Sequence, residues 1–292
     1  MPDDISEAPP SKPRSKGLLQ PGRLLWARAL PWGIVFAVVL WVVYKMAKGA
    51  AGDLGLGGAG PRILVPATLG VLAALALYVL SVRLVERRWP DELALARLGP
   101  ELAVGLVLGA ALFAAAMGVL LAIGAYALTG PTIAPAWKAL AISLTSGVTE
   151  ELIFRGVIFR LLWSTFGPWW ALVLSSALFG VVHLGNPDSD LMAMLGIIFG
   201  AGVPLAALYI LTGRLWASIG YHMAWNFSQG YVFGAQVSGT SFGPSLYRAE
   251  PVAGVDALWS GGAFGPEAAL PTVILAGLAG AALLAMAVRR HT

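Results

Sequence analysis

Uncharged apolar runs of about 20 residues recur along the chain, each bounded by charged residues, Pro or Gly. A membrane-spanning helix needs roughly 20 apolar residues, because a rise of about 1.5 Å per residue must cover a hydrocarbon core of roughly 30 Å. The fold class predicted from this pattern is all-α, a polytopic membrane helix bundle of about eight transmembrane helices. These are expected at residues 29–44, 63–82, 102–128, 139–163, 169–184, 191–211, 215–233 and 270–288.

The composition agrees with this pattern. Apolar residues make up 58% of the chain and charged residues only 12%, whereas a soluble protein carries about 25% charged residues. There is no cysteine, which excludes disulfides, a thiolate nucleophile and thiolate metal ligands. The net charge of +4 is typical of Lys and Arg at helix ends, so we expect no nucleic-acid partner.

The remaining segments complete the predicted organisation. Most Lys and Arg residues fall in connections that share a side with the N-terminus, which predicts that both termini are cytoplasmic. The stretch 234–268 is rich in Gly, Ser and Pro. The expected units are a disordered basic cytoplasmic tail (1–28), two N-terminal transmembrane helices (29–82), an extramembrane Gly/Pro-rich loop (234–268), and a C-terminal transmembrane helix with a basic tail (270–292).

Ionisable residues inside apolar runs are costly, at roughly 2.5–3.5 kcal/mol each near the centre of a membrane helix. The predicted helix 139–163 contains three of them within six positions, Glu150, Glu151 and Arg155. Glu151 and Arg155 are four residues apart and share a helix face, so they are expected to pair. Glu150 lies about 100° away around the helix and is not taken up by that pair.

Neighbouring predicted helices carry His183 and His222, two of the three histidines in the chain. His222 and Asn226 share one helix face, as do Phe179 and His183. Counting residues from the helix ends puts Glu150 about 16–20 Å deep, His183 about 21 Å and His222 about 11 Å. Three helices therefore bring their costliest side chains to overlapping depths.

Each of these features alone has a structural explanation. A buried Glu–Arg pair is often a clamp between helices, and a membrane histidine is often a hydrogen-bonding contact. Together, however, a free carboxylate, two imidazoles and a carboxamide provide what acid–base hydrolysis requires. A carboxylate beside an imidazole can activate water, and a second imidazole with an amide can stabilise an oxyanion.

The arrangement resembles the CPBP family of intramembrane peptidases, which includes the type II CAAX prenyl endopeptidases and is also called the abortive-infection family. The resemblance covers roughly residues 98–233, which would form the catalytic helical core. It is carried by three motifs in order along the chain: Glu150-Glu151-x-x-x-Arg155, Phe179-x-x-x-His183 and His222-x-x-x-Asn226.

The resemblance implies an intramembrane endopeptidase in which Glu150 and His183 activate water while His222 and Asn226 hold the oxyanion. The substrate would be a membrane-associated protein or peptide, prenylated or exported, that is reached from the membrane lipid.

Glu151, Arg155 and Phe179 look like supporting residues of this site. A Glu/His/His set could also bind zinc, and members of the family have been described as metallopeptidases. A glutamate mechanism without a cofactor is preferred here, because the HExxH spacing is absent and Asn226 is a better oxyanion donor than metal ligand.

Two other classes of protein fit the same residues. Buried Glu and His side chains also form proton relays, so a proton- or metal-coupled membrane transporter is one alternative. Such a transporter needs a continuous polar path, and four of the predicted helices supply almost no polar lining. The other is a non-catalytic immunity or scaffold membrane protein that keeps the same fold.

Overall fold

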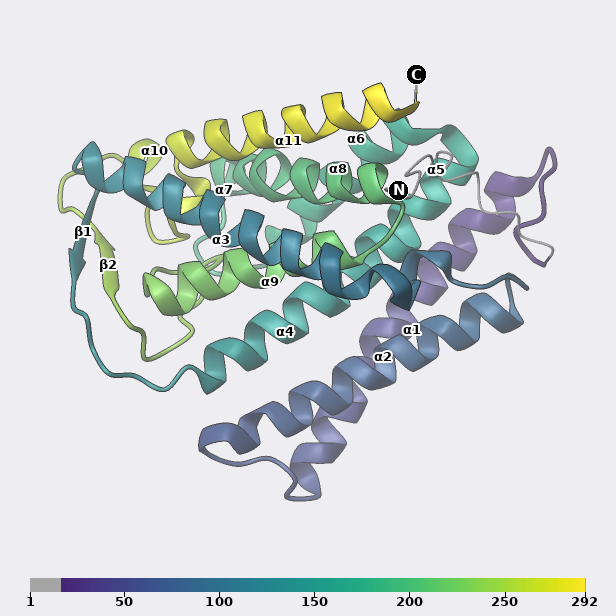
Figure 1. Ribbon diagram of the computed structural model, residues 1–292, viewed down its shortest axis with the longest axis horizontal. Helices are drawn as coiled ribbons and strands as arrows, with labels where there is room; N and C mark the ends of the chain where they lie inside the picture. The colour runs from purple at the N-terminus through teal and green to yellow at the C-terminus, as the bar shows by residue number, and fades with distance from the viewer. Residues whose placement is uncertain (1–16, 292) are drawn as a thin grey trace, which may run out of the picture.

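The computed structural model describes residues 17–291 as a helical bundle with one small two-stranded sheet (Figure 1). Within these residues all eight predicted apolar runs are helical over most of their length, which confirms the all-α membrane bundle. The α-helices are α1 (Leu25–Asp53), α2 (Leu64–Leu84), α3 (Leu98–Ala122), α4 (Trp137–Glu151), α5 (Arg160–Phe166), α6 (Pro168–His183), α7 (Leu191–Ile197), α8 (Val203–Thr212), α9 (Trp216–Phe227), α10 (Ala257–Ser260) and α11 (Leu270–His291).

Three of the predicted membrane helices contain a π-helical segment, in which the backbone turn is wider than in an α-helix. The segment η4 (Leu152–Phe159) joins α4 to α5, η5 (Ile198–Gly202) joins α7 to α8, and η6 (Ser228–Val232) extends α9. Such segments are frequent at functional sites. Here η4 directly follows the predicted catalytic carboxylate, and η6 follows the motif on α9.

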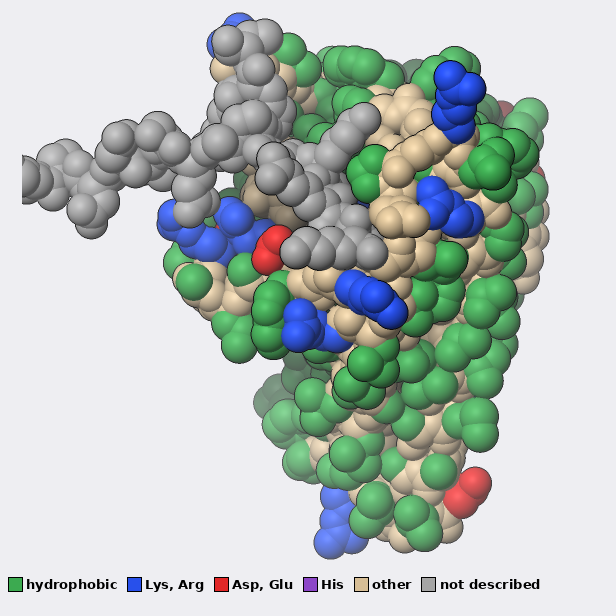
Figure 2. Space-filling model, turned by 90° about the vertical axis from the view of Figure 1, so that its right-hand side faces the viewer, with side chains coloured by type: hydrophobic (Ala, Val, Ile, Leu, Met, Phe, Trp, Pro, Cys, Tyr) green, Lys and Arg blue, Asp and Glu red, His purple; other side chains and the backbone are tan. Residues whose placement is uncertain are grey.

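The surface is that of an integral membrane protein. Five helical spans are long and apolar enough to cross a membrane, and the shorter α6 is also apolar. Large apolar side chains point outward on the outer helices, as Val38, Leu72 and Val107 do. Figure 2 shows a face covered largely by hydrophobic side chains, with Lys and Arg gathered over one part of it. A surface with this many exposed apolar side chains is stable in contact with lipid.

The prediction for residues 102–128 is wrong at its C-terminal end. The helix α3 stops at Ala122, because Gly124 adopts the left-handed conformation (φ 73°) that ends helices. The chain then forms β1 (Tyr126–Thr129), which pairs antiparallel with β2 (Arg248–Pro251). The stretch 234–268 is therefore not a plain loop, since it contains β2, α10 and the 3-10 turn η7 (Pro266–Ala268).

The prediction of a disordered tail at residues 1–28 can be compared with the structure from residue 17 onward, and there it needs a correction. Residues 1–16 lie outside the described part of the chain. From residue 17 onward the chain is held in place, because the backbone N–H groups of Gly17 and Leu18 donate to the carbonyl groups of Glu86 and Val85. Leu19 is buried, and α1 begins at Leu25. The buried side chain of Leu19 therefore anchors this stretch just before the start of α1.

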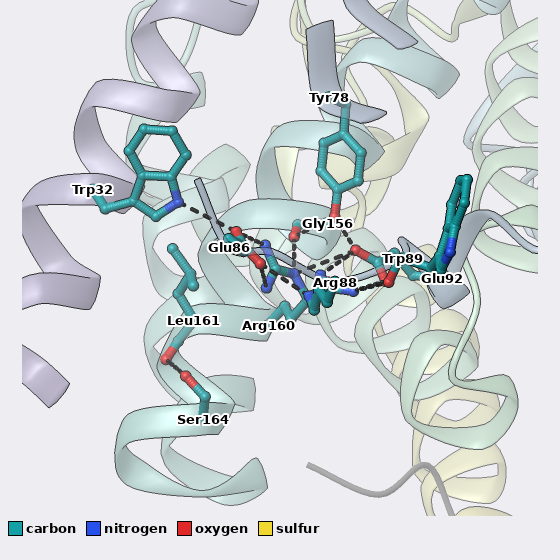
Figure 3. Close-up of polar contacts among 10 residues, drawn as sticks. All are labelled: Trp32, Tyr78, Glu86, Arg88, Trp89, Glu92, Gly156, Arg160, Leu161 and Ser164. Carbon is teal, nitrogen blue, oxygen red and sulfur yellow. Dashed lines mark hydrogen bonds and ion pairs between the residues drawn. The ribbon is translucent and has the colours of Figure 1, made fainter. Parts of the chain in front are cut away.

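Four charged side chains meet where α2 ends and α5 begins, and we call them the closed cluster (Figure 3): Glu86, Arg88, Glu92 and Arg160. Arg160 donates through both Nη atoms to the two carboxylate oxygens of Glu86, at 2.7 and 2.8 Å. Arg88 bridges the two acids, with its Nη atoms 2.7 and 2.8 Å from Glu92 and its Nε atom 3.0 Å from Glu86. The four charges sum to zero.

Neutral groups complete the closed cluster. The Oη atom of Tyr78 lies 2.5 Å from Glu92 Oε1 and 2.8 Å from the carbonyl oxygen of Gly156 in η4. Trp32 Nε1 donates to Glu86 at 3.2 Å. Burial acts to raise the pKa of Glu86, but Arg160 and Arg88 outweigh it, so this pKa is lowered. The cluster ties α1, α2 and the C-terminal end of η4 together.

Candidate active site

A cavity of about 190 Å³ lies between α4, α6, α9 and the stretch 234–268. A cavity of this size has room for several water molecules. Five side chains that the sequence singled out converge on it, since its lining includes Glu150, Phe179, His183, His222 and Asn226, together with Ser146, which the sequence did not single out. The structure thus places all four predicted catalytic residues around one cavity.

Glu150 presents its carboxylate to this cavity from the last turn of α4. Its side chain is 32% exposed, yet its Oε2 atom is buried and finds no hydrogen-bond partner among the described residues. His222 Nε2 is 3.9 Å from that oxygen, too far for a direct hydrogen bond. Glu150 Oε2 therefore keeps hydrogen-bonding capacity that no described protein group uses.

Glu151 binds two partners through one carboxylate oxygen. Its Oε1 atom is 2.9 Å from Arg155 Nη1 and 2.9 Å from His222 Nδ1. Arg155 also donates to the carbonyl oxygen of Gly202 at 3.0 Å. The predicted Glu151–Arg155 pair is confirmed, whereas the bond from Glu151 to His222 was not foreseen. We call Glu150, Glu151, Arg155 and His222 the cavity cluster.

The two histidines are anchored differently. His183 Nδ1 is 2.6 Å from the carbonyl oxygen of Phe179, one turn earlier on α6. Carbonyl and carboxylate oxygens only accept hydrogen bonds, so Nδ1 carries the proton in His183, and in His222 beside the Glu151 carboxylate. Each ring thus keeps Nε2 for the cavity. The anchor of His183 is neutral, while that of His222 is negatively charged.

Phe179 is the apolar contact that joins these groups. Its ring centroid is 4.6 Å from that of His183 and 6.3 Å from that of His222. The Arg155 guanidinium lies 4.7 Å from the same ring, a distance at which a cation is attracted to an aromatic face. Phe179 therefore packs against both imidazoles and against Arg155.

Asn226 lies one helical turn after His222 on α9, on the same face. Its Nδ2 atom donates to Ser146 Oγ on α4 at 3.0 Å. An amide nitrogen carries two hydrogens, so the second remains for another acceptor. The contact with Ser146 fixes the amide orientation, and with it the direction of that second hydrogen.

The stretch 234–268 contributes residues that the sequence did not single out. Val237, Ser238, Thr240, Phe242 and Glu267 all line the cavity. Glu267 Oε1 accepts from the Ser238 backbone N–H at 2.5 Å and from its hydroxyl at 2.7 Å. The only sequence signal for Glu267 was its acidic side chain just before the last apolar run. A charged residue at the end of a membrane helix is common, so this signal did not indicate a site.

The described residues do not group in a way that suits a metal ion. Among the side chains that the structure describes, residues 17–289, no three His, Asp or Glu groups come close enough together to hold one. The arrangement places a carboxylate, two imidazole Nε2 atoms and an amide hydrogen around one cavity.

Comparison with known proteins agrees with this geometry. Residues 132–228 match the family model described as type II CAAX prenyl endopeptidase Rce1-like. A Bacillus subtilis (strain 168) protein named "Putative membrane peptidase YdiL" is 34% identical over 84 residues, which are 29% of this chain. The alignment spans 32% of the length of that relative. No solved structure matches the chain. The matched segment holds the three motifs predicted from the sequence, and over this segment the chain is similar to the Rce1-like type II CAAX prenyl endopeptidases.

Proposed function

We propose that this protein is an intramembrane endopeptidase that hydrolyses a peptide bond in a membrane-associated protein. The observation that carries the proposal is the convergence of Glu150, His183, His222 and Asn226 on one cavity within a lipid-facing bundle. The match to the Rce1-like family supports the reaction class. The substrate reaches the cavity from the lipid, and both termini are proposed to lie in the cytoplasm.

Water activation is assigned to Glu150 and His183. Glu150 Oε2 is buried without a partner among the described residues, and such an oxygen gains most from a bound water. His183 Nδ1 is held by the Phe179 carbonyl oxygen, so Nε2 is the nitrogen that would exchange a proton with the cavity. A base positioned this way typically contributes about 100-fold to 10,000-fold in rate.

Oxyanion stabilisation is assigned to His222 and Asn226. His222 lies between the carboxylates of Glu150 and Glu151, with Arg155 beside them. When His222 is protonated, these four charges sum to zero, and Nε2 becomes a donor directed at the cavity. The free amide hydrogen of Asn226 is a second donor. Losing one such donor typically costs about 100-fold in rate or more.

The test replaces Glu150 with Gln, which keeps the size of the side chain and removes the charge. Purified protein in lipid vesicles is incubated with membrane proteins from a host that lacks this gene, and new peptide termini are identified by mass spectrometry. Termini should appear with the wild-type protein and be absent with Glu150→Gln and, separately, with His183→Ala. The exposed Glu250 on β2 provides a matched control, Glu250→Gln, which should cleave normally.

The opposite result would contradict the mechanism. If the same termini still form with both Glu150→Gln and His183→Ala, water activation by these groups is wrong. Ion flux into the vesicles that disappears with Glu150→Gln, in the absence of cleavage, would favour a transporter instead.

A further inference from the structure

A second carboxyl group faces the cavity from outside the three motifs. Glu267 belongs to η7, its residue is 6% exposed, and it lines the same cavity as Glu150. It lies beyond residues 132–228, the part that matches the family model. Burying a carboxyl group is costly, and none of the assignments made so far uses it.

Glu267 and Glu150 reach the cavity from different parts of the bundle. The turn η7 packs against α7 and α11, whereas α4 packs against α2 and α9. His183 on α6 is within electrostatic reach of Glu267. The cavity thus has a carboxyl group on α4 and another on η7, with imidazoles from α6 and α9 in its lining.

The surroundings of Glu267 favour a particular protonation state. Burial is the largest influence on its pKa and raises it, while hydrogen bonds from Ser238 and Gln229 and the nearby His183 imidazole offset this only in part. The pKa is raised from the usual 4.5. Oε1 accepts both hydrogen bonds from Ser238, so a proton on this carboxyl group resides on Oε2.

We propose that Glu267 is a further catalytic residue, the general acid that protonates the departing amine when the peptide bond breaks. This inference rests on the proposed peptidase function. A peptide amide needs such a proton, because an amide anion is too basic to leave on its own. Ser238 holds the carboxyl group in place.

The protons balance over one turnover. Water forms a bond to the carbonyl carbon while one of its protons passes to the Glu150–His183 pair. The oxyanion then re-forms the C=O bond as the C–N bond breaks, and the carboxyl proton of Glu267 passes to the departing nitrogen. The Glu267 carboxylate regains a proton from the Glu150–His183 pair through cavity water.

The test compares two leaving groups. The first probe is an internally quenched apolar peptide, chosen from a panel as the one that the wild-type protein in vesicles cleaves fastest. The second is the same acyl segment as an aryl ester, whose phenolate leaves without a proton. Glu267→Gln keeps an oxygen for Ser238. It should lower amide cleavage about 100-fold or more and leave aryl ester cleavage within about threefold of wild type.

A structural role would give a different pattern. If Glu267 only maintained the shape of the cavity, both probes would be cleaved more slowly by the same factor, and the proposal would be overturned. It would equally be overturned if neither rate changed. Glu267→Asp, which keeps an acid, should restore part of the amide activity, and Glu250→Gln should match wild type on both probes.

Failure of this proposal is distinguishable from failure of the proposed function. Glu150→Gln should abolish cleavage of both probes, because it removes water activation itself. If Glu150→Gln cleaves both normally, the peptidase mechanism fails whatever Glu267→Gln does. If Glu150→Gln is inactive and Glu267→Gln slows both probes equally, only the role of Glu267 as an acid is wrong.

Discussion

Two groups of buried charges lie at the two ends of η4, and they differ in what they leave unpaired. In the closed cluster, each carboxylate oxygen of Glu86 and Glu92 has an arginine within hydrogen-bond distance. In the cavity cluster, Glu150 Oε2, Glu151 Oε2 and Arg155 Nε are buried without a partner among the described residues. Both sets contain two carboxylates, and both include residues of the continuous helical stretch formed by α4, η4 and α5.

The difference separates a structural network from a functional one. An unsatisfied buried polar group costs about 1–3 kcal/mol, so a fold does not keep three of them in one place without a reason. A fully paired network has no spare donor or acceptor for a substrate. The closed cluster is therefore expected to govern stability, and the cavity cluster to govern activity.

The largest effect is expected from breaking the closed cluster. Arg160→Met leaves Glu86 without its two-pronged partner in a buried site, and removing one member of a buried ion pair typically costs about 3–5 kcal/mol. Chemical unfolding in detergent should show this loss, while turnover per folded molecule stays near wild type. The exposed Arg97 serves as a matched control, and Arg97→Met should change stability by less than about 0.5 kcal/mol. A stability unchanged by Arg160→Met would contradict the comparison.

A smaller effect, of a different kind, is expected in the cavity cluster. Glu151→Gln removes the carboxylate that accepts the His222 Nδ1 hydrogen bond, and with it the contact that directs Nε2 at the cavity. Turnover per folded molecule should fall about 100-fold, as for the loss of one oxyanion donor. Stability should also fall, because Arg155 loses its partner. If Glu151→Gln lowers stability and leaves turnover per folded molecule unchanged, Glu151 has a structural role like that of the residues in the closed cluster.

The smallest effect concerns the protonation of one acid in the closed cluster. The pKa of Glu86 is lowered from 4.5 in the folded protein, so the folded state binds its proton less readily than the unfolded chain does. The stabilisation is complete above about pH 4.5 and is lost as the pH falls through the lowered pKa. The free energy of unfolding, measured from pH 7 to 3, should show this decline. In Glu86→Gln, the part of the decline that comes from protonation of Glu86 should be absent. An identical pH slope in both proteins would exclude Glu86 as the source.

Much of the fold was predictable because its signals are local. The length of an apolar run determines whether it can cross a membrane, and a spacing of four residues is enough to pair Glu151 with Arg155. The shared depth of Glu150, His183 and His222 also followed from counting along helices. These inferences needed only the rise and the turn of an α-helix.

The rest depends on contacts between distant segments. Glu86 and Arg160 are 74 positions apart, and no local pattern links them. The strand β1 pairs with a strand more than a hundred residues later. Glu267 reaches the cavity because η7 packs on α7 and α11, and the bond from Glu151 to His222 requires α4 and α9 to meet. The widened turn of η4 likewise has no signature in its residue types.

The position of the reactive groups limits the form in which a substrate can be cut. Glu150, His183 and His222 line a cavity inside the bundle and have to reach the carbonyl group of the bond, whereas in an α-helix the side chains surround the backbone and the interior peptide groups are hydrogen-bonded within the helix. A segment that crosses the bilayer as a helix must therefore uncoil around the bond to be cut. In lipid, each backbone group exposed by uncoiling has to find a new partner. Selectivity would then depend on how easily a chain unwinds at that depth, as well as on the side chains beside the bond.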